Sequence, residues 1–153
     1  MARGYAPVAV VLLLAVTVVA AAGVALALPE LSAEPPPKRG VVAEATADGR
    51  VSLTLVSGAE VDTRDLDVRV VVGGEPLRHQ PPVPFFAARG FRGGPTGPFN
   101  FAADPTWQVG EAASFRVAAT NDPALSTGAE VAVELRVRGS PVAGATTTVE
   151  EGS

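Results

Sequence analysis

Cysteine is absent from this sequence of 153 residues, and its absence excludes several kinds of site at once. Disulfide bonds, thiolate metal centres, cysteine nucleophiles and a lipidated N-terminal cysteine all require that residue. Histidine is nearly absent, because His79 is the only one. Asp62, Asp65 and Asp67 are closely spaced, but they lack the ordered ligands of an EF-hand, and turn capping explains them better. With no metal set and no credible Ser-His-Asp spacing, we expect no metal, no cofactor and no enzymatic activity.

Positive charge is too sparse to suggest a nucleic-acid partner. The chain has 12 Lys and Arg residues against 16 Asp and Glu residues, which gives a formal net charge of −4. A nucleic-acid surface needs clustered cations, because these displace the counterions of the phosphate backbone. Residues 88–94 (ARGFRGG) resemble an RNA-binding RGG segment, but one short copy in an acidic chain indicates a surface loop. We therefore expect no nucleic-acid partner.

What the chain does contain is one long apolar run near its start. Residues 5–28 read YAPVAVVLLLAVTVVAAAGVALAL and carry no charge. A helix of this length would be about 36 Å long, and the hydrocarbon core of a bilayer is about 30 Å thick. The run can therefore span a membrane with some tilt. Pro29 ends it, because proline cannot continue a helix.

The rest of the chain has the pattern of a β-domain. Residues 29–40 (PELSAEPPPKRG) form a linker whose three consecutive prolines favour a stiff spacer. From residue 41 onward, apolar and polar residues alternate with period two, which predicts strands. The predicted strands are residues 41–46, 51–56, 66–72, 114–120, 130–138 and 142–149. Between the first two, Asp48-Gly49 predicts a hairpin turn.

Residues 80–106 interrupt this pattern with a high density of proline and glycine. Such a segment predicts irregular structure. Its phenylalanines (Phe85, Phe86, Phe91, Phe99 and Phe101) indicate a loop packed onto the domain, and Trp107 is expected to be a packing anchor. The predicted fold is an N-terminal transmembrane α-helix followed by a small all-β, sandwich-like domain.

Three interpretations of residues 5–28 remain open. Ala25-Leu26-Ala27 could form a signal-peptidase site that releases a soluble domain, although the run exceeds the usual apolar length of about 7–15 residues. The run could instead be an uncleaved single-pass anchor. In that case the β-domain would be a binding or envelope-structural module that does not polymerise. The third interpretation depends on the residues just before the run.

Arg3-Gly4, followed directly by Tyr5-Ala6-Pro7, resembles the N-terminus of archaeal type IV pilins, most closely those of salt-loving archaea. In that family a prepilin peptidase removes a short basic leader and leaves the apolar helix in place. The resemblance therefore implies cleavage between Gly4 and Tyr5. Pro7 would then lie in the first helical turn, where a missing N–H costs little. The resemblance extends to residues 53–62 (LTLVSGAEVD), 107–111 (WQVGE) and 127–131 (TGAEV).

The predicted helix also has small residues at four-residue spacing, which allow close helix packing: Ala21 with Ala25, and Gly23 with Ala27. The resemblance implies a filament subunit whose partners are the membrane, a prepilin peptidase, and like or related pilin subunits that it contacts through this helix. Surface adhesion is likewise implied by the family. The predicted organisation is a leader (residues 1–4), a helix (5–28), a linker (29–40) and an extracytoplasmic β-domain (41–150).

Overall fold

The structure is a computed structural model that describes residues 38–152. The predicted leader and helix, with most of the linker, lie outside the described residues. Within residues 38–152, no helix has the length and apolar character needed to cross a membrane. The described residues belong to one compact unit, Pro36–Ser153. This unit is all-β, as the period-two pattern predicts.

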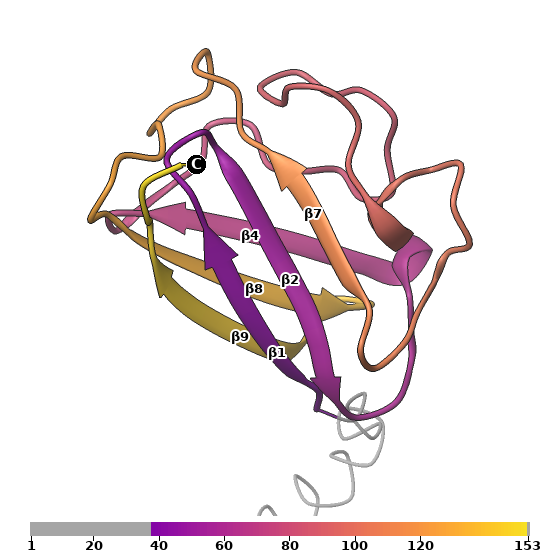
Figure 1. Cartoon of the computed structure of the whole chain (residues 1–153). Coiled ribbons are helices and arrows are strands. Elements are labelled where there is room, and N and C mark those ends of the chain that lie inside the picture. The colour runs from indigo at the N-terminus through magenta and orange to yellow at the C-terminus, as the bar shows by residue number, and fades with distance from the viewer. Residues whose placement is uncertain (1–37, 153) are drawn as a thin grey trace, which may run out of the picture. The chain divides into compact units, whose positions relative to one another are not determined.

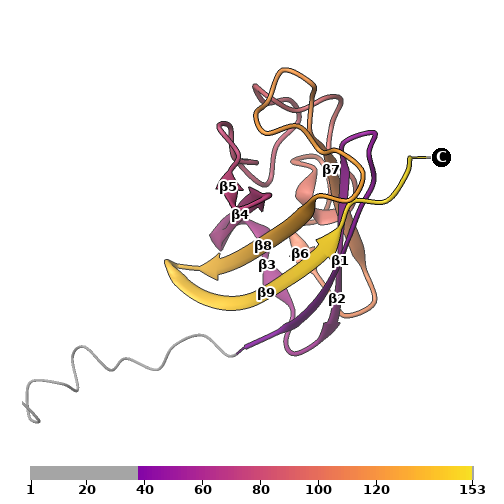
Figure 2. The same ribbon diagram turned by 90° about the vertical axis from the view of Figure 1, so that its left-hand side faces the viewer.

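Most of the domain is built from two antiparallel sheets that face each other (Figures 1 and 2). The first has the order β1-β2-β7, from β1 (Gly40–Ala45), β2 (Arg50–Ser57) and β7 (Ala112–Arg116). The second has the order β5-β4-β8-β9, from β5 (Glu75–Pro76), β4 (Leu66–Val72), β8 (Glu130–Val137) and β9 (Ser140–Thr148). A separate short pair joins β3 (Val61–Asp62) to β6 (Thr106–Trp107). Two 3-10 turns, η2 (Thr63–Asp65) and η3 (Gly97–Phe99), complete the elements.

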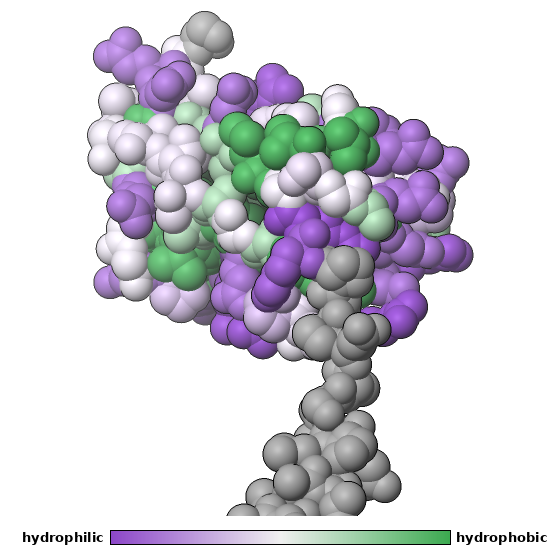
Figure 3. Space-filling view, turned by 90° about the horizontal axis from the view of Figure 1, so that it is seen from below, coloured by the Kyte–Doolittle hydropathy of each residue, from purple (hydrophilic) through white to green (hydrophobic). Residues whose placement is uncertain are grey.

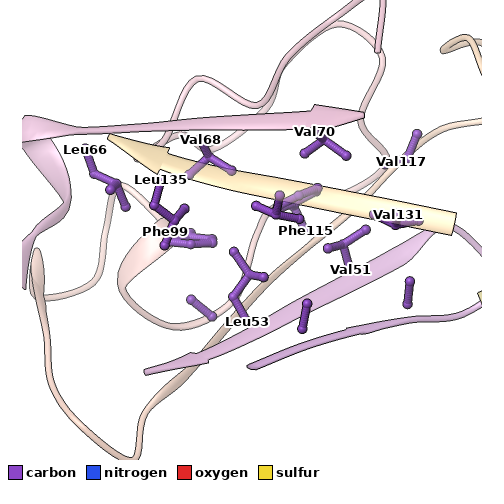
Figure 4. Close-up of a cluster of buried hydrophobic side chains, with 14 of the residues drawn as sticks. Val51, Leu53, Leu66, Val68, Val70, Phe99, Phe115, Val117, Val131 and Leu135 are labelled. Atoms are coloured by element: carbon purple, nitrogen blue, oxygen red, sulfur yellow. The ribbon is translucent and has the colours of Figure 1, made fainter. Parts of the chain in front are cut away.

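Alternating side chains of the two sheets fill the core between them. In β2, Val51, Leu53 and Leu55 are fully buried, whereas the residues between them are partly exposed. The same alternation in β8 buries its four large apolar side chains. Figure 4 shows residues of β2, β4 and β8 meeting around Phe99 and Phe115. An antiparallel sheet with one buried face accounts for this pattern.

The two sheets are joined along one side by β1 and β9, which run parallel. At one end of this seam, Arg39 N donates to Val142 O at 2.8 Å. At the other end, Glu150 N donates to Ala45 O at 2.9 Å, and Ala47 N donates to Glu150 O at 2.8 Å. These bonds satisfy backbone groups that would otherwise be open at the sheet edges. They also fix the position of the first strand.

Hairpin turns connect neighbouring strands: Gly73-Gly74 joins β4 to β5, and two further turns join longer strands. The predicted turn at Asp48-Gly49 is confirmed, because Gly49 N donates to Thr46 O at 3.0 Å and Thr46 N donates to Arg50 O at 2.9 Å. The turn from β8 to β9 lies at Arg138-Gly139, where φ is 50° and 82°. Two consecutive positive φ values match the twist of a short hairpin. The predicted strand 130–138 therefore ends one residue early, because Arg138 is in the turn.

Other strand boundaries also differ from the prediction. The strand predicted at 114–120 is β7, which runs from Ala112 to Arg116. Its partner β2 begins at Arg50, so residues beyond Arg116 have no strand beside them; Ala118 N instead donates to Gly90 O at 2.9 Å. β1 begins at Gly40, within the predicted linker, and β9 at Ser140. The two-residue strands β3, β5 and β6 are too short to give a periodic signal.

The segment 80–106 packs onto the domain as its phenylalanines predict. Phe85 and Phe99 are buried, and their rings belong to a chain of contacts that also includes Phe91, Phe115 and Trp107, with centroids 5.2 to 6.3 Å apart. The prediction was incomplete in two respects. The segment contains η3, and Phe86 and Phe101 project outward with 57% and 65% of their surface exposed.

Candidate functional site

The residues that the sequence singles out for processing and helix packing lie outside the described part of the chain. They are Arg3, Gly4 and Tyr5 at the proposed cleavage site and Ala21, Gly23, Ala25 and Ala27 on the helix. Their roles stay predictions. The described residues do contain the point at which the chain enters the β-domain, and a cavity lined by arginines.

Lys38 and Arg39 are held at the start of β1 by two neighbouring segments. Lys38 Nζ donates to Pro141 O at 2.7 Å, and the backbone of Arg39 bonds to Val142 in the same β9 strand. On the other side, Arg39 Nε donates to Ala59 O and Arg39 Nη2 donates to Glu60 O, both at 3.2 Å. Residues 38–40 therefore form a built attachment point, which we call the junction.

Two glycines make this junction possible. Gly58 has φ of +99°, and a Cβ there would lie 3.0 Å from Arg39 Cγ and 3.1 Å from Lys38 O. A Cβ on Gly40 would collide with the Ser57 hydroxyl. The chain can approach the β2–β3 turn this closely because Gly58 has no side chain, whereas a side chain at position 40 would require the Ser57 hydroxyl to move. The first described residues lie at one end of the β-sandwich, and the C-terminus is at the other end (Figure 1).

The segment 107–111 forms a tight turn that leads into β7. Trp107 is fully buried, and its Nε1 donates to Glu111 O at 2.8 Å. The Glu111 carboxylate accepts from Gln108 N at 3.0 Å, and Gly110 N donates to Leu55 O at 2.7 Å. Trp107, Gly110 and Glu111 of the WQVGE sequence therefore all take part in hydrogen bonds that hold this turn. The expectation that Trp107 is a packing anchor is confirmed.

Two of the three closely spaced aspartates, Asp62 and Asp65, have arginine partners. Asp62 caps η2 by accepting from Arg64 N at 2.9 Å, and it forms an ion pair with the Arg64 side chain at 2.7 Å. The hydrogen bonds from Arg64 lower the pKa of Asp62 to about 2. Asp65 forms a 3.5 Å ion pair with Arg138, and Asp67 lies on β4. Among residues 38–152 there is no cluster of three or more side chains suited to a metal ion.

Asn121 is a buried polar residue that the sequence analysis did not identify. Its Oδ1 accepts from His79 N at 3.1 Å, and its Nδ2 donates to His79 O at 2.9 Å and to Gly90 O at 3.2 Å. It therefore ties both ends of the segment 79–90 to the chain beyond β7. Nothing around position 121 in the sequence distinguishes this asparagine from one in a surface turn.

Three arginines from different parts of the chain surround a cavity of about 310 Å³, which we call the arginine pocket. Arg50 begins β2, Arg116 ends β7, and Arg92 lies on the segment that runs beside β7 (Figure 1). The remaining lining comes from Gly93, Gly94, Thr96, Ser114 and Phe115. No local sequence pattern indicates this cluster, because the pairing of β2 with β7 is what brings Arg50 opposite Arg116.

A second hollow of about 350 Å³ lies on the outer face of the sheet β4-β8-β9. Ala132 and Gly144 leave space there, and Arg69, Glu134 and Thr146 stand around it. Glu134 is already paired with Arg136 at 2.7 Å. This hollow has fewer converging polar groups than the arginine pocket has.

No protein-family model matches the chain, and no significant match is found among curated proteins.

Proposed function

We propose that this protein is a pilin-like structural protein of the cell surface, inserted in the membrane by its N-terminal helix and assembled into a type IV pilus-like filament. One observation carries the proposal. The uncharged run of residues 5–28 is preceded directly by Arg3-Gly4, the arrangement that a prepilin peptidase would cleave while leaving the helix intact. In a filament, the helices would pack in the core, and the β-domain would form the outer surface.

The junction supports this proposal. A subunit that is held in a filament by its N-terminal helix must carry load from that helix into its outer domain. Lys38 and Arg39 are bonded to both β9 and the β2–β3 turn, so a pull on the chain at this point would be shared by two elements of the domain. A loosely tethered module would not need such bonding.

The surface of the β-domain offers apolar contacts to neighbouring subunits. Viewed from below, apolar residues gather in patches with hydrophilic residues between them (Figure 3). The large apolar side chains that are about half exposed or more are Val42, Val56, Phe86, Phe101 and Val109. Surface apolar patches of this kind often mark contacts between proteins. Lateral contact between β-domains would cover part of this area.

N-terminal mass spectrometry tests the proposal. The chain is expressed with an archaeal prepilin peptidase, extracted from the membrane and sequenced from its N-terminus. We expect Tyr5 to be the first residue. Gly4→Phe should block the cleavage, because a bulky side chain would replace the small residue at the scissile bond. Ala2→Phe is the matched control, since it adds the same side chain within the leader but away from that bond.

The other results distinguish the remaining interpretations. An intact N-terminus in the unmodified chain would contradict the proposal and identify a single-pass anchored β-domain that does not polymerise. A start at Leu28 would identify a secreted domain released by signal peptidase. If Tyr5 is the first residue but electron microscopy finds no filaments when the chain is expressed with a pilus assembly system, the processing is established and the filament role is wrong.

A further inference from the structure

The arginine pocket is a built feature of the domain. Arg92 N donates to Arg116 O at 2.8 Å, and Thr96 N donates to Ser114 O at 2.8 Å, so the segment 92–96 is held along the free edge of β7. Because Arg50 and Arg116 are direct partners in the β2–β7 ladder, the three cationic residues have fixed backbone positions. Such preorganisation reduces the entropic cost of binding a ligand.

The pocket retains positive charge. Its lining contains Arg50, Arg92 and Arg116 but no acidic residue. Asp48 lies beside it, with its carboxylate 3.3 Å from Arg116 Nη2 and its backbone carbonyl 3.3 Å from Arg92 Nη2. That carboxylate also accepts from the Thr46 hydroxyl and from Arg50 N. Glu44 lines an adjoining hollow together with Arg50. Two negative charges beside the pocket therefore face three positive ones, and the pocket keeps a net positive charge.

Unused hydrogen-bonding capacity is found among the residues that line the pocket. Arg116 Nε is buried and has no hydrogen-bond partner within residues 38–152. Leaving a buried donor of a charged group without an acceptor is costly. The Thr96 and Ser114 hydroxyls are 2.6 Å apart, and this contact uses only one of their two protons. The pocket thus combines cationic donors with a neutral hydroxyl pair.

We propose that the arginine pocket binds a sugar that carries an oxyanion, either a carboxylate or a sulfate. Arginine forks match the paired oxygens of such groups. The volume of about 310 Å³ is at the lower end of ordinary ligand sites, which begin at about 300 Å³, so it suits one small ring. The hydroxyl pair of Thr96 and Ser114 offers hydrogen bonds to ring hydroxyls. The proposal concerns the β-domain alone and does not rest on filament assembly.

Isothermal titration calorimetry on the full chain tests the proposal. The protein is held in an uncharged polyoxyethylene detergent, which contains neither a sugar nor an oxyanion, at constant ionic strength. The titrants are glucuronate, glucose 6-sulfate, glucose and sodium sulfate. We expect saturable binding of the two charged sugars, weaker binding of inorganic sulfate and no binding of glucose. Arg50→Gln and Arg92→Gln should each weaken binding by about tenfold, the effect of losing a charge-assisted hydrogen bond.

Arg69→Gln is the matched control, because Arg69 lies on the outer face of the other sheet and does not line this pocket. It should leave the affinity unchanged. Nitrogen-15 spectra should also show the Arg116 Nε–H resonance moving on addition of glucuronate. The proposal is overturned if neither charged sugar binds, or if Arg50→Gln and Arg92→Gln change the affinity no more than Arg69→Gln does. Equal affinity for sulfate and glucose 6-sulfate would overturn the assignment to a sugar.

Discussion

Trp107 connects the turn that leads into β7 to the aromatic core of the domain. Its indole ring packs against Phe99 with centroids 5.2 Å apart, and its Nε1 bonds to Glu111 across the turn that leads into β7. It also belongs to β6, whose partner β3 follows the first hairpin. The side chain therefore links the segment 80–106 to the turn that leads into β7.

Substitution of Trp107 should separate the packing contribution from the hydrogen bond. Trp107→Ala should lower the free energy of unfolding by about 3–5 kcal/mol, because it leaves a large cavity. Trp107→Phe keeps most of the ring but leaves Glu111 O without its donor, which should cost about 1–3 kcal/mol. Since this is the only tryptophan, the unfolding curves should be followed by circular dichroism. If Trp107→Ala and Trp107→Phe lower the free energy of unfolding equally, the separation of ring packing from the hydrogen bond is contradicted.

Asp62 provides a prediction that depends on pH. Its pKa is about 2, below the usual 3.8, because Arg64 donates hydrogen bonds to its carboxylate. A depressed pKa means that the cap is stabilising above pH 3.8 and is lost as the pH falls through about 2. In Arg64→Gln, the nuclear magnetic resonance titration midpoint of Asp62 should rise toward 3.8. Arg78→Gln, which removes an arginine that takes no part in this bonding, should leave the midpoint near 2.

At the scale of elements, a side chain covers part of a sheet edge where no strand is paired. Beyond the two residues that pair with β5, the outer edge of β4 is covered by the side chain of Gln80. Val70 N donates to Gln80 Oε1 at 2.7 Å, and Gln80 Nε2 donates to Val70 O at 3.0 Å. An amide side chain thus replaces one backbone unit of a neighbouring strand, which protects an exposed edge.

Replacing Gln80 with leucine should show how much the Gln80 hydrogen bonds contribute to the stability of the domain. Gln80→Leu removes the side-chain acceptor of Val70 N and one of the donors to Val70 O, which keeps its bond from Leu77 N at 3.0 Å. The free energy of unfolding should therefore fall by about 1–3 kcal/mol, mainly from the unpaired Val70 N, as measured by urea denaturation. Hydrogen exchange at the Val70 amide should become faster. Gln108→Leu is the matched control at an exposed turn, and surface changes of this kind usually alter stability by less than about 0.5 kcal/mol. Similar losses in both variants would show that the Gln80 bonds contribute nothing.

At the scale of the whole molecule, the β-domain has its own core and its own closed seam. The buried apolar residues that make up the core all lie between Ala43 and Val149, and the seam between β1 and β9 uses only Arg39, Val142 and the residues near Ala45 and Glu150. All of these residues belong to the compact unit Pro36–Ser153.

A chain of residues 36–153 should therefore fold by itself. We expect a far-ultraviolet circular dichroism spectrum typical of β-sheet and a single cooperative transition on heating. Removing residues 36–39 as well should lower the melting temperature, because Lys38 and Arg39 would no longer bond to β9 and the β2–β3 turn. A chain of residues 36–153 that unfolds without cooperativity would show that the domain depends on its N-terminal segment.

The sequence predicted the long strands well and the short elements poorly, for a physical reason. In β2, β4 and β8 one face is buried along the whole strand, so the alternation of Val and Leu with polar residues is long enough to recognise. β3, β5 and β6 have two residues each and no period. The end of β7 depends on where its partner β2 begins, which is a property of pairing and not of the residues around Arg116.

By itself, the sequence determined that residues 5–28 form a long uncharged run and that an alternating apolar and polar pattern follows it. It also excluded cysteine chemistry. These three properties depend only on which residues are present and on their order. Tertiary structure alone decided which distant groups meet. Arg50, Arg92 and Arg116 line one pocket because β2 pairs with β7 and the segment 92–96 follows its free edge. Asn121 is buried because it bonds to both His79 and Gly90. Contacts between residues far apart in the chain arise from strand pairing and loop packing, which no local pattern records.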